Sequence, residues 1–540
     1  MAPRLIRGGE YLHVAFAGGE CSIPFRPGVT IREILDTTTL RVRSSCGGVG
    51  ACGQCLVRIE QGEVNPPTVT EVNRLGSERI EQGSRLACQV RPLREVRISI
   101  DAVAPLSGWR SLSETEYLSC AYSGDAGAMP ARSGYGAAID LGTTQIRVSV
   151  LELATGKRIA GRCGLNPQGA FGADVLSRVM AACESEGRAR EIGGVAREAI
   201  GEALLDIGLR EDVPLGEITQ LAIVGNTAMC CLLVEKNYDL LLLPDNWMRG
   251  VDCRPAETRQ WCAAWGLAAG AAVEVVQPLA GFVGSDLLAG VRATGLTDGP
   301  PGSLLIDFGT NSEMALWDGS VAWVSSAAGG PAFEGCGISC GMPAEPGAIC
   351  QAALADDSAF VLGVLGGGEA KGLCGSGLVD VIAGLLRTGQ LKHNGRFTRE
   401  IGDTGVLLSK DHGGITLKNR DIDALQRAKA AIGAGVQCLL GQAGMGIGDL
   451  RRICVCGAFG RQLDIGNAQE IGLLPAVPAE RIELCGNTAL AGCERLLLSA
   501  DGPAVLEALK KKCRIINLSL VENFEELFIE NLYLKPIPRQ

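Results

Sequence analysis

Apolar and polar positions alternate in two different ways along the chain. Residues 1–100 contain short strand-like runs, YLHVAF, CLVRIE and VRISI, separated by glycine and proline. This pattern is typical of a small sheet with tight turns. From Tyr135 onward, short apolar runs (AAID, LAIVG, LLIDFG, ICVCG) alternate with longer helical stretches. Short buried strands between helices predict an α/β fold for this part.

Two further features follow from the same pattern. Residues 101–134 are rich in Ser, Gly and Ala and lack steady periodicity, so they are interpreted as a mobile linker without a core of its own. The stretch DIDALQRAKAAIGAGVQCLLGQ predicts a helix over 421–442, with Asp421 as its N-cap.

One internal repeat stands out. GAAIDLGTTQIRVSVLE and SLLIDFGTNSEMALWDG share an apolar-Ile-Asp-x-Gly-Thr-polar pattern, which predicts strand, tight turn and strand. The aspartates of the two copies, Asp140 and Asp307, lie 167 residues apart. Two copies at this spacing indicate two similar lobes, roughly 135–300 and 301–540, that face a cleft.

The composition excludes several classes of protein. Of 540 residues, 46% are hydrophobic and 20% are charged, and the net charge is −10. These values indicate globular domains and argue against nucleic-acid binding. No apolar run approaches the roughly 18 residues of a membrane-spanning helix, and the start of the chain lacks a signal-peptide layout. We therefore expect a cytoplasmic protein without a nucleic-acid or membrane partner.

The charge is unevenly distributed. Residues 1–100 hold 13 basic and 10 acidic residues, a net +3, whereas the rest holds 37 basic and 50 acidic residues, a net −13. A basic first domain suggests an acidic docking partner. The candidate docking residues are Arg41, Arg43, Arg58 and Arg85. A fixed structural role for these arginines is an equally good interpretation.

Four of the 22 cysteines form a ligand pattern. Cys46, Cys52 and Cys55 lie in the glycine-rich run CGGVGACGQC, and Cys88 follows in RLACQV. Four thiolates, three of them on one tight loop, are what a [2Fe–2S] cluster needs. A structural zinc site is the alternative, but such sites usually show two C-x2-C pairs, and only one is present here.

Most of the other cysteines lie singly in apolar stretches. Cys163, Cys183 and Cys438 are examples, and we interpret them as core residues. Cys336 and Cys340, in EGCGISCG, are close enough in sequence to suggest a second cluster shared between two subunits. We prefer the interpretation that the N-terminal cluster alone supplies the redox function.

The repeat predicts a nucleotide site. No Walker A motif is present in the sequence, so the turns after Asp140 and Asp307 are the candidates for binding phosphates through backbone N–H groups and threonine hydroxyls. The two aspartates are candidates for organising Mg²⁺. The candidate phosphate-binding residues are Gly142, Thr143, Thr144, Gly309, Thr310 and Asn311. A third element, ICVCGAFGRQ, ends in a glycine turn where backbone can approach a flat ring, formed by Gly457, Ala458, Phe459 and Gly460.

A further carboxylate follows the second turn. Glu313 is a candidate for positioning a water molecule, although a surface or strand-end carboxylate is the simpler interpretation.

Both parts of the chain resemble known folds. The cysteine spacing is similar to that of adrenodoxin-type ferredoxins, in which a β-grasp sheet holds the [2Fe–2S] cluster. The two turns and the glycine-ended strand resemble the phosphate-1, phosphate-2 and adenosine motifs of the superfamily of acetate kinase, sugar kinases, heat-shock chaperone ATPases and actin. GNTAM and GNTALAGCERLL fall where that superfamily places its two connecting helices.

Together these parts resemble one family, the reductive activators of corrinoid-dependent enzymes. The resemblance implies an α/β and α+β multidomain protein: a β-grasp ferredoxin domain over 1–100, a linker over 101–134, and a two-lobed ATPase domain over 135–540. It also implies that ATP and Mg²⁺ are used to reduce the Co(II) corrinoid of a methyltransferase-system protein to Co(I). The implied partners are that corrinoid protein, an external low-potential electron donor and a second copy of the chain.

Two other functions fit the same residues. One is a small-molecule kinase with an appended ferredoxin, for which Asp286 or Glu313 would be the candidate base. The other is a redox sensor in which the cluster gates a nucleotide-dependent interaction without turnover. Neither alternative is specified by a substrate pattern in the sequence.

Overall fold

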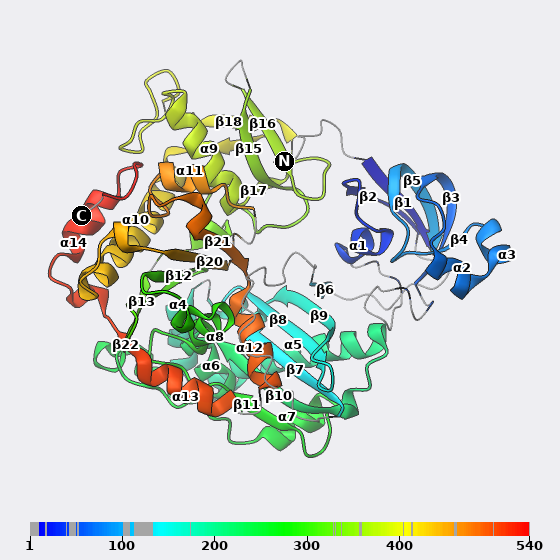
Figure 1. Cartoon of the computed structure of the whole chain (residues 1–540), viewed down its shortest axis with the longest axis horizontal. Coiled ribbons are helices and arrows are strands. Elements are labelled where there is room, and N and C mark those ends of the chain that lie inside the picture. The colour runs from blue at the N-terminus through cyan, green and yellow to red at the C-terminus, as the bar shows by residue number, and fades with distance from the viewer. Residues whose placement is uncertain are drawn as a thin grey trace.

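The architecture consists of a small β domain beside two larger lobes (Figure 1). This computed structural model describes residues 10–16, 19–38, 40, 42, 50, 53, 55–100, 109–112, 133–172, 174–327, 329, 331–335, 337–355, 359–402, 404–411, 414–457, 459, 462–499 and 502–538. Cys46, Cys52, Cys336, Ala458, Gly460, Arg41 and Arg43 lie outside the described residues.

The N-terminal domain is built on a mixed sheet with strand order β2-β1-β5-β3-β4. Its strands are β1 (Glu10–Phe16), β2 (Gly19–Phe25), β3 (Leu56–Val64), β4 (Ser84–Leu86) and β5 (Pro92–Ile100), and its helices are α1 (Ile31–Asp36), α2 (Val69–Leu75) and α3 (Ser77–Glu81). β1 and β2 form an antiparallel hairpin, and β5 lies parallel to β1. This arrangement confirms the expected β-grasp fold, and we call residues 1–100 the ferredoxin domain.

Helix α1 ties this sheet to the segment that carries Cys88. Thr30 caps the helix and forms a capping box with Glu33. The first amides of the helix then donate to that segment, from Ile31 N to Val90 O at 2.8 Å and from Arg32 N to Ala87 O at 2.9 Å. The position of Cys88 is therefore fixed by backbone hydrogen bonds on both sides.

The two lobes repeat one sheet topology. The first lobe has the order β11-β10-β7-β8-β9-β6, and the second has β21-β20-β12-β13-β14-β22. The first-lobe strands are β6 (Arg110–Ser111), β7 (Tyr135–Leu141), β8 (Gln145–Glu152), β9 (Arg158–Leu165), β10 (Ile218–Gly225) and β11 (Ala272–Val275). The second-lobe strands are β12 (Ser303–Phe308), β13 (Ser312–Trp317), β14 (Ala322–Ala327), β20 (Arg452–Gly457), β21 (Ile482–Gly486) and β22 (Cys513–Ile515).

The pairing is equivalent in both copies, and it confirms the repeat predicted from sequence. β7 is antiparallel to β8 and parallel to β10, just as β12 is antiparallel to β13 and parallel to β20. Smaller sheets are added to the second lobe by β15 (Ala348–Leu354), β16 (Phe360–Val364) and β17 (Gly372–Leu373), and by β18 (Val406–Ser409) and β19 (Ile415–Leu417).

Helices cover the sheets and join the lobes. The first lobe contains α4 (Val175–Cys183), α5 (Glu186–Glu211), α6 (Thr227–Val234), α7 (Thr258–Ala264) and α8 (Ser285–Thr294). The second contains α9 (Gly375–Arg387), α10 (Asn419–Gln442), α11 (Ile465–Glu470), α12 (Thr488–Leu498), α13 (Gly502–Lys512) and α14 (Phe524–Asn531). The motifs GNTAM and GNTALAGCERLL begin α6 and α12, with Asn226 and Asn487 as N-caps.

Helices α8 and α12 pack against each other where the lobes meet. Helix α12 also contacts β7 and β10 of the first lobe, and α8 contacts β12 and β13 of the second. A Cβ at Gly492 would overlap the carbonyl oxygen of Ala289, so this helix crossing requires glycine. The buried core shared by both lobes includes Leu288, Leu305 and Leu490.

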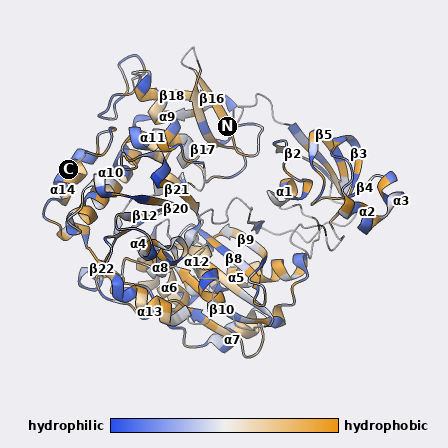
Figure 2. Cartoon of the chain, in the orientation of Figure 1, coloured by the Kyte–Doolittle hydropathy of each residue, from blue (hydrophilic) through white to orange (hydrophobic). Residues whose placement is uncertain are grey.

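Hydrophobic residues are concentrated on the central strands, whereas covering helices such as α13 show mixed polarity (Figure 2). Within the described residues, no helix is long and apolar enough to cross a membrane.

Three expectations from sequence need correction. Helix α10 begins at Asn419 and is capped by Lys418, so Asp421 lies in the first turn, where its carboxylate accepts from Lys418 N at 2.8 Å. Trp109 is buried and β6 pairs with β9, so the expected absence of a packed core is wrong for residues 109–112. Cys163 and Cys438 are buried as expected, but Cys183 is exposed.

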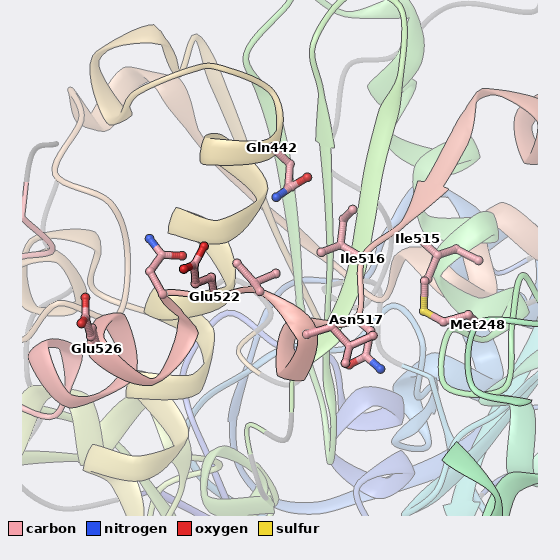
Figure 3. Close-up of a pocket in the computed structure, with 10 residues that line it drawn as sticks. Met248, Gln442, Ile515, Ile516, Asn517, Glu522 and Glu526 are labelled. Atoms are coloured by element: carbon pink, nitrogen blue, oxygen red, sulfur yellow. The ribbon is translucent and has the colours of Figure 1, made fainter. Parts of the chain in front are cut away.

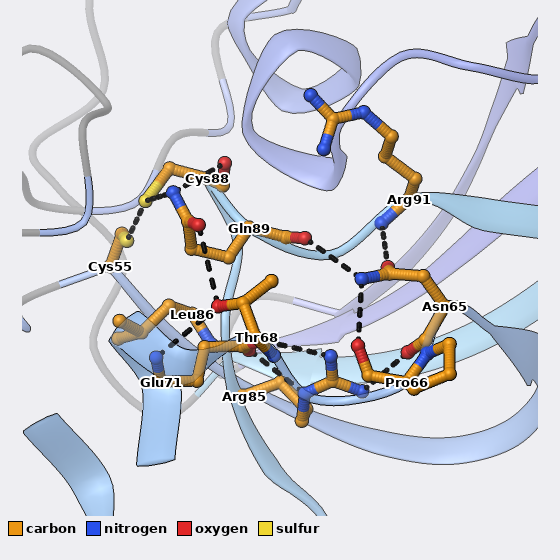
Figure 4. A network of polar contacts seen from close by, with 10 residues as sticks. All are labelled: Cys55, Asn65, Pro66, Thr68, Glu71, Arg85, Leu86, Cys88, Gln89 and Arg91. Atoms are coloured by element: carbon orange, nitrogen blue, oxygen red, sulfur yellow. Dashed lines mark hydrogen bonds and ion pairs between the residues drawn. The ribbon is translucent and has the colours of Figure 1, made fainter. Parts of the chain in front are cut away.

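A buried ion pair stabilises the ferredoxin domain (Figure 4). Arg85 Nε and Nη2 donate to the two carboxylate oxygens of Glu71 at 2.8 and 2.9 Å. Glu71 also accepts from the backbone N–H groups of Thr68 and Leu86 at 2.9 and 3.1 Å. Arg85 therefore has a structural role, and its interpretation as a docking residue is wrong. Arg58, in contrast, is exposed.

We expect Glu71→Gln to destabilise the ferredoxin domain by about 3–5 kcal/mol, because it leaves Arg85 buried without a matching charge. The thermal loss of the cluster's visible absorption measures this effect. Glu20→Gln is the matched control: it breaks the exposed Arg97–Glu20 pair and should change stability by less than about 1 kcal/mol. Equal midpoints for the two variants would contradict a stabilising role for the buried pair.

Candidate functional site

The two repeats bring their aspartates to one cleft. Asp140 lies near the end of β7 and Asp307 near the end of β12. Both line a cavity of about 1080 Å³, together with all six residues of the two candidate phosphate loops. The structure thus brings together the two turns that the sequence placed 167 residues apart.

The candidate phosphate loops meet through threonine hydroxyls. Thr144 Oγ1 lies 3.1 Å from Thr310 Oγ1. Both hydroxyls donate to the same carboxylate oxygen of Glu334, Thr144 at 3.0 Å and Thr310 at 2.7 Å. The loops of the two lobes are therefore in direct contact.

The first loop is held by its surroundings. Gly142 N donates to Gln145 O at 3.0 Å, and a Cβ at Gly142 would lie 2.7 Å from the same oxygen, so the tight turn requires glycine. Asn166 Nδ2 donates to the carbonyl of Gly142 at 2.9 Å, and Arg178 Nη1 donates to that of Thr143 at 2.6 Å. These hydrogen bonds to the carbonyl oxygens fix the position of the loop backbone.

Asp140 is buried but has polar partners. Asn487 Nδ2 donates to its Oδ2 at 2.7 Å, and Arg147 Nη1 lies 3.5 Å from the same oxygen. Burial nevertheless raises the pKa of Asp140, and the Arg147 charge and the Asn487 hydrogen bond only partly oppose this effect. Asn487 comes from the N-cap of α12, so a residue of the second lobe holds the aspartate of the first.

Three more carboxylates share the same interior. Burial, followed by repulsion from Asp140, raises the pKa of Asp286 to about 7. Burial, followed by repulsion from Asp286 and Asp140, also raises the pKa of Asp307 to about 7. Burial raises the pKa of Glu313 well above its ordinary range. Mg²⁺ binds carboxylates directly or through water, and a cation here would relieve the repulsion between these groups.

Glu313 is therefore not a surface carboxylate, but it does lie at a strand end, as the second residue of β13. It is 7% exposed and pairs with Asp307 across β12 and β13. Its role in positioning water stays a prediction.

The third predicted element is only partly described. Gly457 has φ +84°, and a Cβ there would overlap the carbonyl oxygen of Phe308, so the turn requires glycine. Phe459 is buried, and its ring lies 4.9 Å from that of Phe308 and 5.3 Å from that of Phe333. The described part of the turn is thus anchored in the second-lobe core beside the cleft.

The structure describes two of the four cysteines that are predicted to bind the cluster. Cys55 and Cys88 are buried with their sulfurs 3.4 Å apart. Two thiolates on one tetrahedral ion with metal–sulfur bonds near 2.3 Å are separated by about 3.8 Å, so this pair fits a shared iron. Gly50 and Gly53 have φ of +83° and +71°, as a loop curled around a cluster requires.

The environment of Cys88 favours a thiolate (Figure 4). The pKa of Cys88 is lowered to about 6, first by the hydrogen bond from Cys55 and then by that from Gln89, with a smaller contribution from the Arg32 charge. Gln89 Nε2 lies 3.7 Å from the Cys88 sulfur, and Thr68 Oγ1 donates to Gln89 Oε1 at 3.4 Å. The pKa of Cys55 is raised, first by its hydrogen bond to Cys88 and then by burial.

Three residues of the cleft were not found from the sequence: Glu334, Asn487 and Arg147. The signal for Asn487 was present, since GNT occurs at the start of both connecting helices. Arg147 follows the first turn on β8, opposite Asp140 in the strand register. Glu334 carries no periodic or repeated signal.

Another cavity lies away from these groups, with a volume of about 770 Å³ (Figure 3). Its lining includes Met248, Gln442, Asn517 and Glu522. It contains none of the residues predicted to bind nucleotide or cluster, so we assign it no part in the site.

We expect Asp140→Asn and Asp307→Asn each to reduce ATP hydrolysis by orders of magnitude, because each removes a charge that would face Mg²⁺. The cluster's absorption spectrum should not change. Leu205→Gln, on the exposed face of α5, is a control that should hydrolyse ATP normally. Normal hydrolysis by both Asp variants would place the nucleotide site elsewhere.

We expect Mg²⁺ to stabilise the protein more at pH 8 than at pH 6. The pKa of Asp286 and of Asp307 rises on folding from 3.8 to about 7, so these groups take up protons on folding. Their contribution to stability is therefore greatest at low pH and falls as the pH rises toward 7. Above pH 7 both are ionised, and Mg²⁺ binds them without displacing protons.

The measurement is the shift in melting temperature caused by Mg²⁺ at each pH. Asp286→Asn should flatten the dependence, and a shift independent of pH in the wild type would contradict metal binding by these carboxylates.

Comparison with protein families gives matches over most of the chain. The model described as the C-terminal domain of RACo, the ASKHA domain, matches residues 302–538. The model for the RACo middle region matches residues 135–299. A 2Fe-2S iron-sulfur cluster binding domain matches residues 14–93.

Individual relatives agree with these matches. Corrinoid activation enzyme RamQ of Eubacterium limosum is 31% identical over 432 residues, which is 74% of this chain and 70% of that protein. The [Co(II) methylated amine-specific corrinoid protein] reductase of Methanosarcina barkeri is 29% identical over 408 residues, 70% of this chain and 72% of that protein.

A solved structure supports the fold. The structure titled "Reductive activator for corrinoid,iron-sulfur protein" is 24% identical, covers 98% of this chain and 99% of its own, and has a TM-score of 0.66. Because the chain matches the 2Fe-2S and ASKHA domain models and is 31% identical to a corrinoid activation enzyme over 74% of its length, it belongs to the family of reductive activators of corrinoid-dependent enzymes.

Proposed function

We propose that this chain is an ATP-dependent reductive activator of a corrinoid protein. It passes one electron from its [2Fe–2S] cluster to the Co(II) corrinoid of a methyltransferase-system partner and so restores Co(I). The named relatives are a corrinoid activation enzyme and a Co(II) corrinoid protein reductase. The cluster supplies the one-electron chemistry, and the ATPase domain binds ATP and Mg²⁺.

One structural observation carries the proposal. Cys88 and Gln89 of the ferredoxin domain line the same cavity as Asp140, Thr143 and Asp307 of the nucleotide cleft. A predicted cluster ligand and the predicted phosphate-binding loops therefore line one cavity. This placement supports a coupling between nucleotide binding and electron transfer within one chain.

The coupling has an energetic reason. A [2Fe–2S] cluster with four cysteine ligands has a reduction potential of about −400 mV. Reduction to Co(I) needs a lower potential, and each ~59 mV uphill costs a factor of ten in a one-electron equilibrium. Nucleotide binding offsets this cost if it favours a complex in which the corrinoid is easier to reduce.

An external low-potential donor must re-reduce the cluster after each turnover. Homodimer formation and a cytoplasmic location are further parts of the proposal.

The test is anaerobic mixing of the protein, a reductant, Mg-ATP and the candidate corrinoid protein while the cobalt spectrum is recorded. We expect conversion of Co(II) to Co(I) that requires both ATP and the cluster. Iron and sulfide should each be about two per chain, and the Cys55→Ala variant should be inactive.

Other outcomes would support a different function. ADP formation stimulated by a small molecule, without cobalt reduction, would favour the kinase alternative. Nucleotide-dependent binding of the partner without electron transfer would favour the sensor.

The ferredoxin domain contacts both lobes. Arg32 Nη2 lies 3.2 and 3.3 Å from the two carboxylate oxygens of Glu211, at the end of α5, and both side chains are largely buried. Arg26 Nη2 donates to Val364 O of β16, in the second lobe, at 2.7 Å. We propose that this docked arrangement is one of two positions of the ferredoxin domain. The domain leaves the docked position to reach the corrinoid partner.

The charges at this contact support reversible docking. Glu211 also binds Arg162 at 3.2 Å, Arg162 binds Asp206, and Arg210 Nε donates to Asp206 at 2.6 Å. Arg162 and Arg210 thus already balance Asp206 and Glu211. When Arg32 departs, no uncompensated buried charge remains on the ATPase domain, so release avoids the large cost of an unpaired buried ion.

We expect Arg32→Gln to loosen the ferredoxin domain and increase the radius of gyration measured by small-angle X-ray scattering. Its matched control is Arg74→Gln, which removes the same charge from an exposed position of the same domain. High salt should act in the same direction but more weakly than Arg32→Gln, because a largely buried pair is screened much less than an exposed one. Identical scattering from the two variants would show that Arg32 does not hold the domain.

A further inference from the structure

Glu334 occupies an unusual place in the nucleotide cleft. It ends a 3-10 turn over Pro331–Glu334, and one of its carboxylate oxygens accepts hydrogen bonds from two hydroxyls. The donors are Thr144 of the first lobe at 3.0 Å and Thr310 of the second at 2.7 Å. A single anionic oxygen therefore bridges the two lobes.

The two hydroxyl donors relate this contact to nucleotide binding. Thr144 and Thr310 lie in the two loops that are predicted to bind nucleotide phosphates, and a phosphate oxygen between them would accept the same two hydrogen bonds. The charge of Glu334 also adds to the repulsion around Asp307. A nucleotide phosphate and Glu334 thus compete for the same donors, and both are negative.

We propose that Glu334 is an internal stand-in for a nucleotide phosphate. It holds the phosphate loops of the two lobes together in the nucleotide-free protein, and ATP displaces it. The inference rests on the proposed function, since it assumes that this cleft binds ATP. In this role Glu334 is a positioning residue, because it acts on the two threonines and takes no part in bond breaking.

Two glycines follow Glu334 closely in the chain, and the first of them, Gly335, packs against the backbone of Met342. Gly335 and Gly337 have φ of +80° and +77°, a region that glycine enters without strain. A Cβ at Gly337 would meet nothing within 4 Å. Beyond them, Ser339 is fixed at α10, where its backbone N–H and its hydroxyl donate to Asp421 at 2.7 and 2.6 Å.

The same segment leads back toward the ferredoxin domain. Glu345 accepts from Arg110 Nη2 at 2.7 Å. Arg110 lies on β6, the edge strand of the first-lobe sheet, which follows the ferredoxin domain in the chain. In this proposal, displacement of Glu334 affects β6 through residues 337–345, a segment that is also held by Asp421 of α10 and by the backbone of Leu373.

The competing role for Glu334 is that of a Mg²⁺-positioning carboxylate. The two roles predict opposite effects of Glu334→Gln. If Glu334 competes with phosphate, removal of its charge strengthens nucleotide binding, because a like charge at a few ångströms is lost. If it serves the metal, the same change weakens binding of Mg-ATP.

The experiment is calorimetric titration of the full-length protein with ATP, in EDTA and with Mg²⁺. We expect Glu334→Gln to bind ATP about tenfold more tightly in EDTA and no more weakly with Mg²⁺. Glu334→Asp, which keeps the charge on a shorter side chain, should not bind ATP more tightly than the wild type. Glu369→Gln is the matched control: it removes an exposed carboxylate of the same lobe and should leave both affinities unchanged.

A second measurement follows the segment itself. In the wild type, amide hydrogen exchange in residues 337–345 should become faster when ATP binds. In Glu334→Gln it should already be fast without nucleotide, because the Gln carbonyl is a weaker acceptor than a carboxylate.

Two results would overturn the inference. One is unchanged or weaker ATP binding by Glu334→Gln in EDTA, and the other is exchange in residues 337–345 that does not respond to ATP in the wild type. If the wild type itself fails to bind ATP, the proposed function fails instead, so the two failures are distinguishable.

Discussion

The burial of four carboxylates is the constraint on which the cleft of this protein depends. Asp140, Asp286, Asp307 and Glu313 lie where the two repeated lobes meet, and each has a pKa raised first by burial. Such a group of acids is costly unless protons or a cation accompany it. A cation bound among these carboxylates, such as the Mg²⁺ predicted to accompany ATP, would lower this cost. Glu334 adds a further negative charge to this interior. Because it accepts hydrogen bonds from one threonine of each lobe, the same charge also contributes to the contact between the lobes.

The duplicated topology is what makes this concentration of charge possible. Each lobe ends its central strand in an aspartate followed by a Gly-Thr turn, and the crossing of α8 and α12 sets the two ends face to face. That crossing depends on close backbone contact, since a side chain at Gly492 would overlap Ala289. Asn487, which caps α12, hydrogen-bonds to Asp140, so the helix that joins the lobes also holds a carboxylate of the site. A change in the angle between the lobes thus alters the charge site and the threonine contact together.

The ferredoxin domain adds the redox partner to this arrangement. Its internal stability comes from a β-grasp core and a buried Glu71–Arg85 pair, both independent of the ATPase domain. Its contact with the lobes, in contrast, uses Arg32 and Arg26, one toward each lobe. Because the two contacts lie on opposite sides of the cleft, movement of the lobes strains at least one of them. In the proposed function, this geometry links the nucleotide state to the position of the ferredoxin domain.

The sequence by itself determined the local chemistry. The cysteine spacing, the repeated Asp-x-Gly-Thr turns and the strand periodicity predicted the ferredoxin domain, the two lobes and the cleft aspartates, because each signal depends on residues close together in the chain.

Only the tertiary structure decided which distant residues complete the site. Asn487 meets Asp140 across 347 residues, Glu334 meets Thr144 across 190, and Arg32 meets Glu211 across 179. It also showed that Arg85, a candidate docking residue from the sequence, belongs to a buried ion pair. Hydrophobic periodicity indicates which face of an element is buried. The relative placement of the elements, however, depends on how whole lobes pack. A single polar residue in a loop has no periodic pattern that would indicate its tertiary partner.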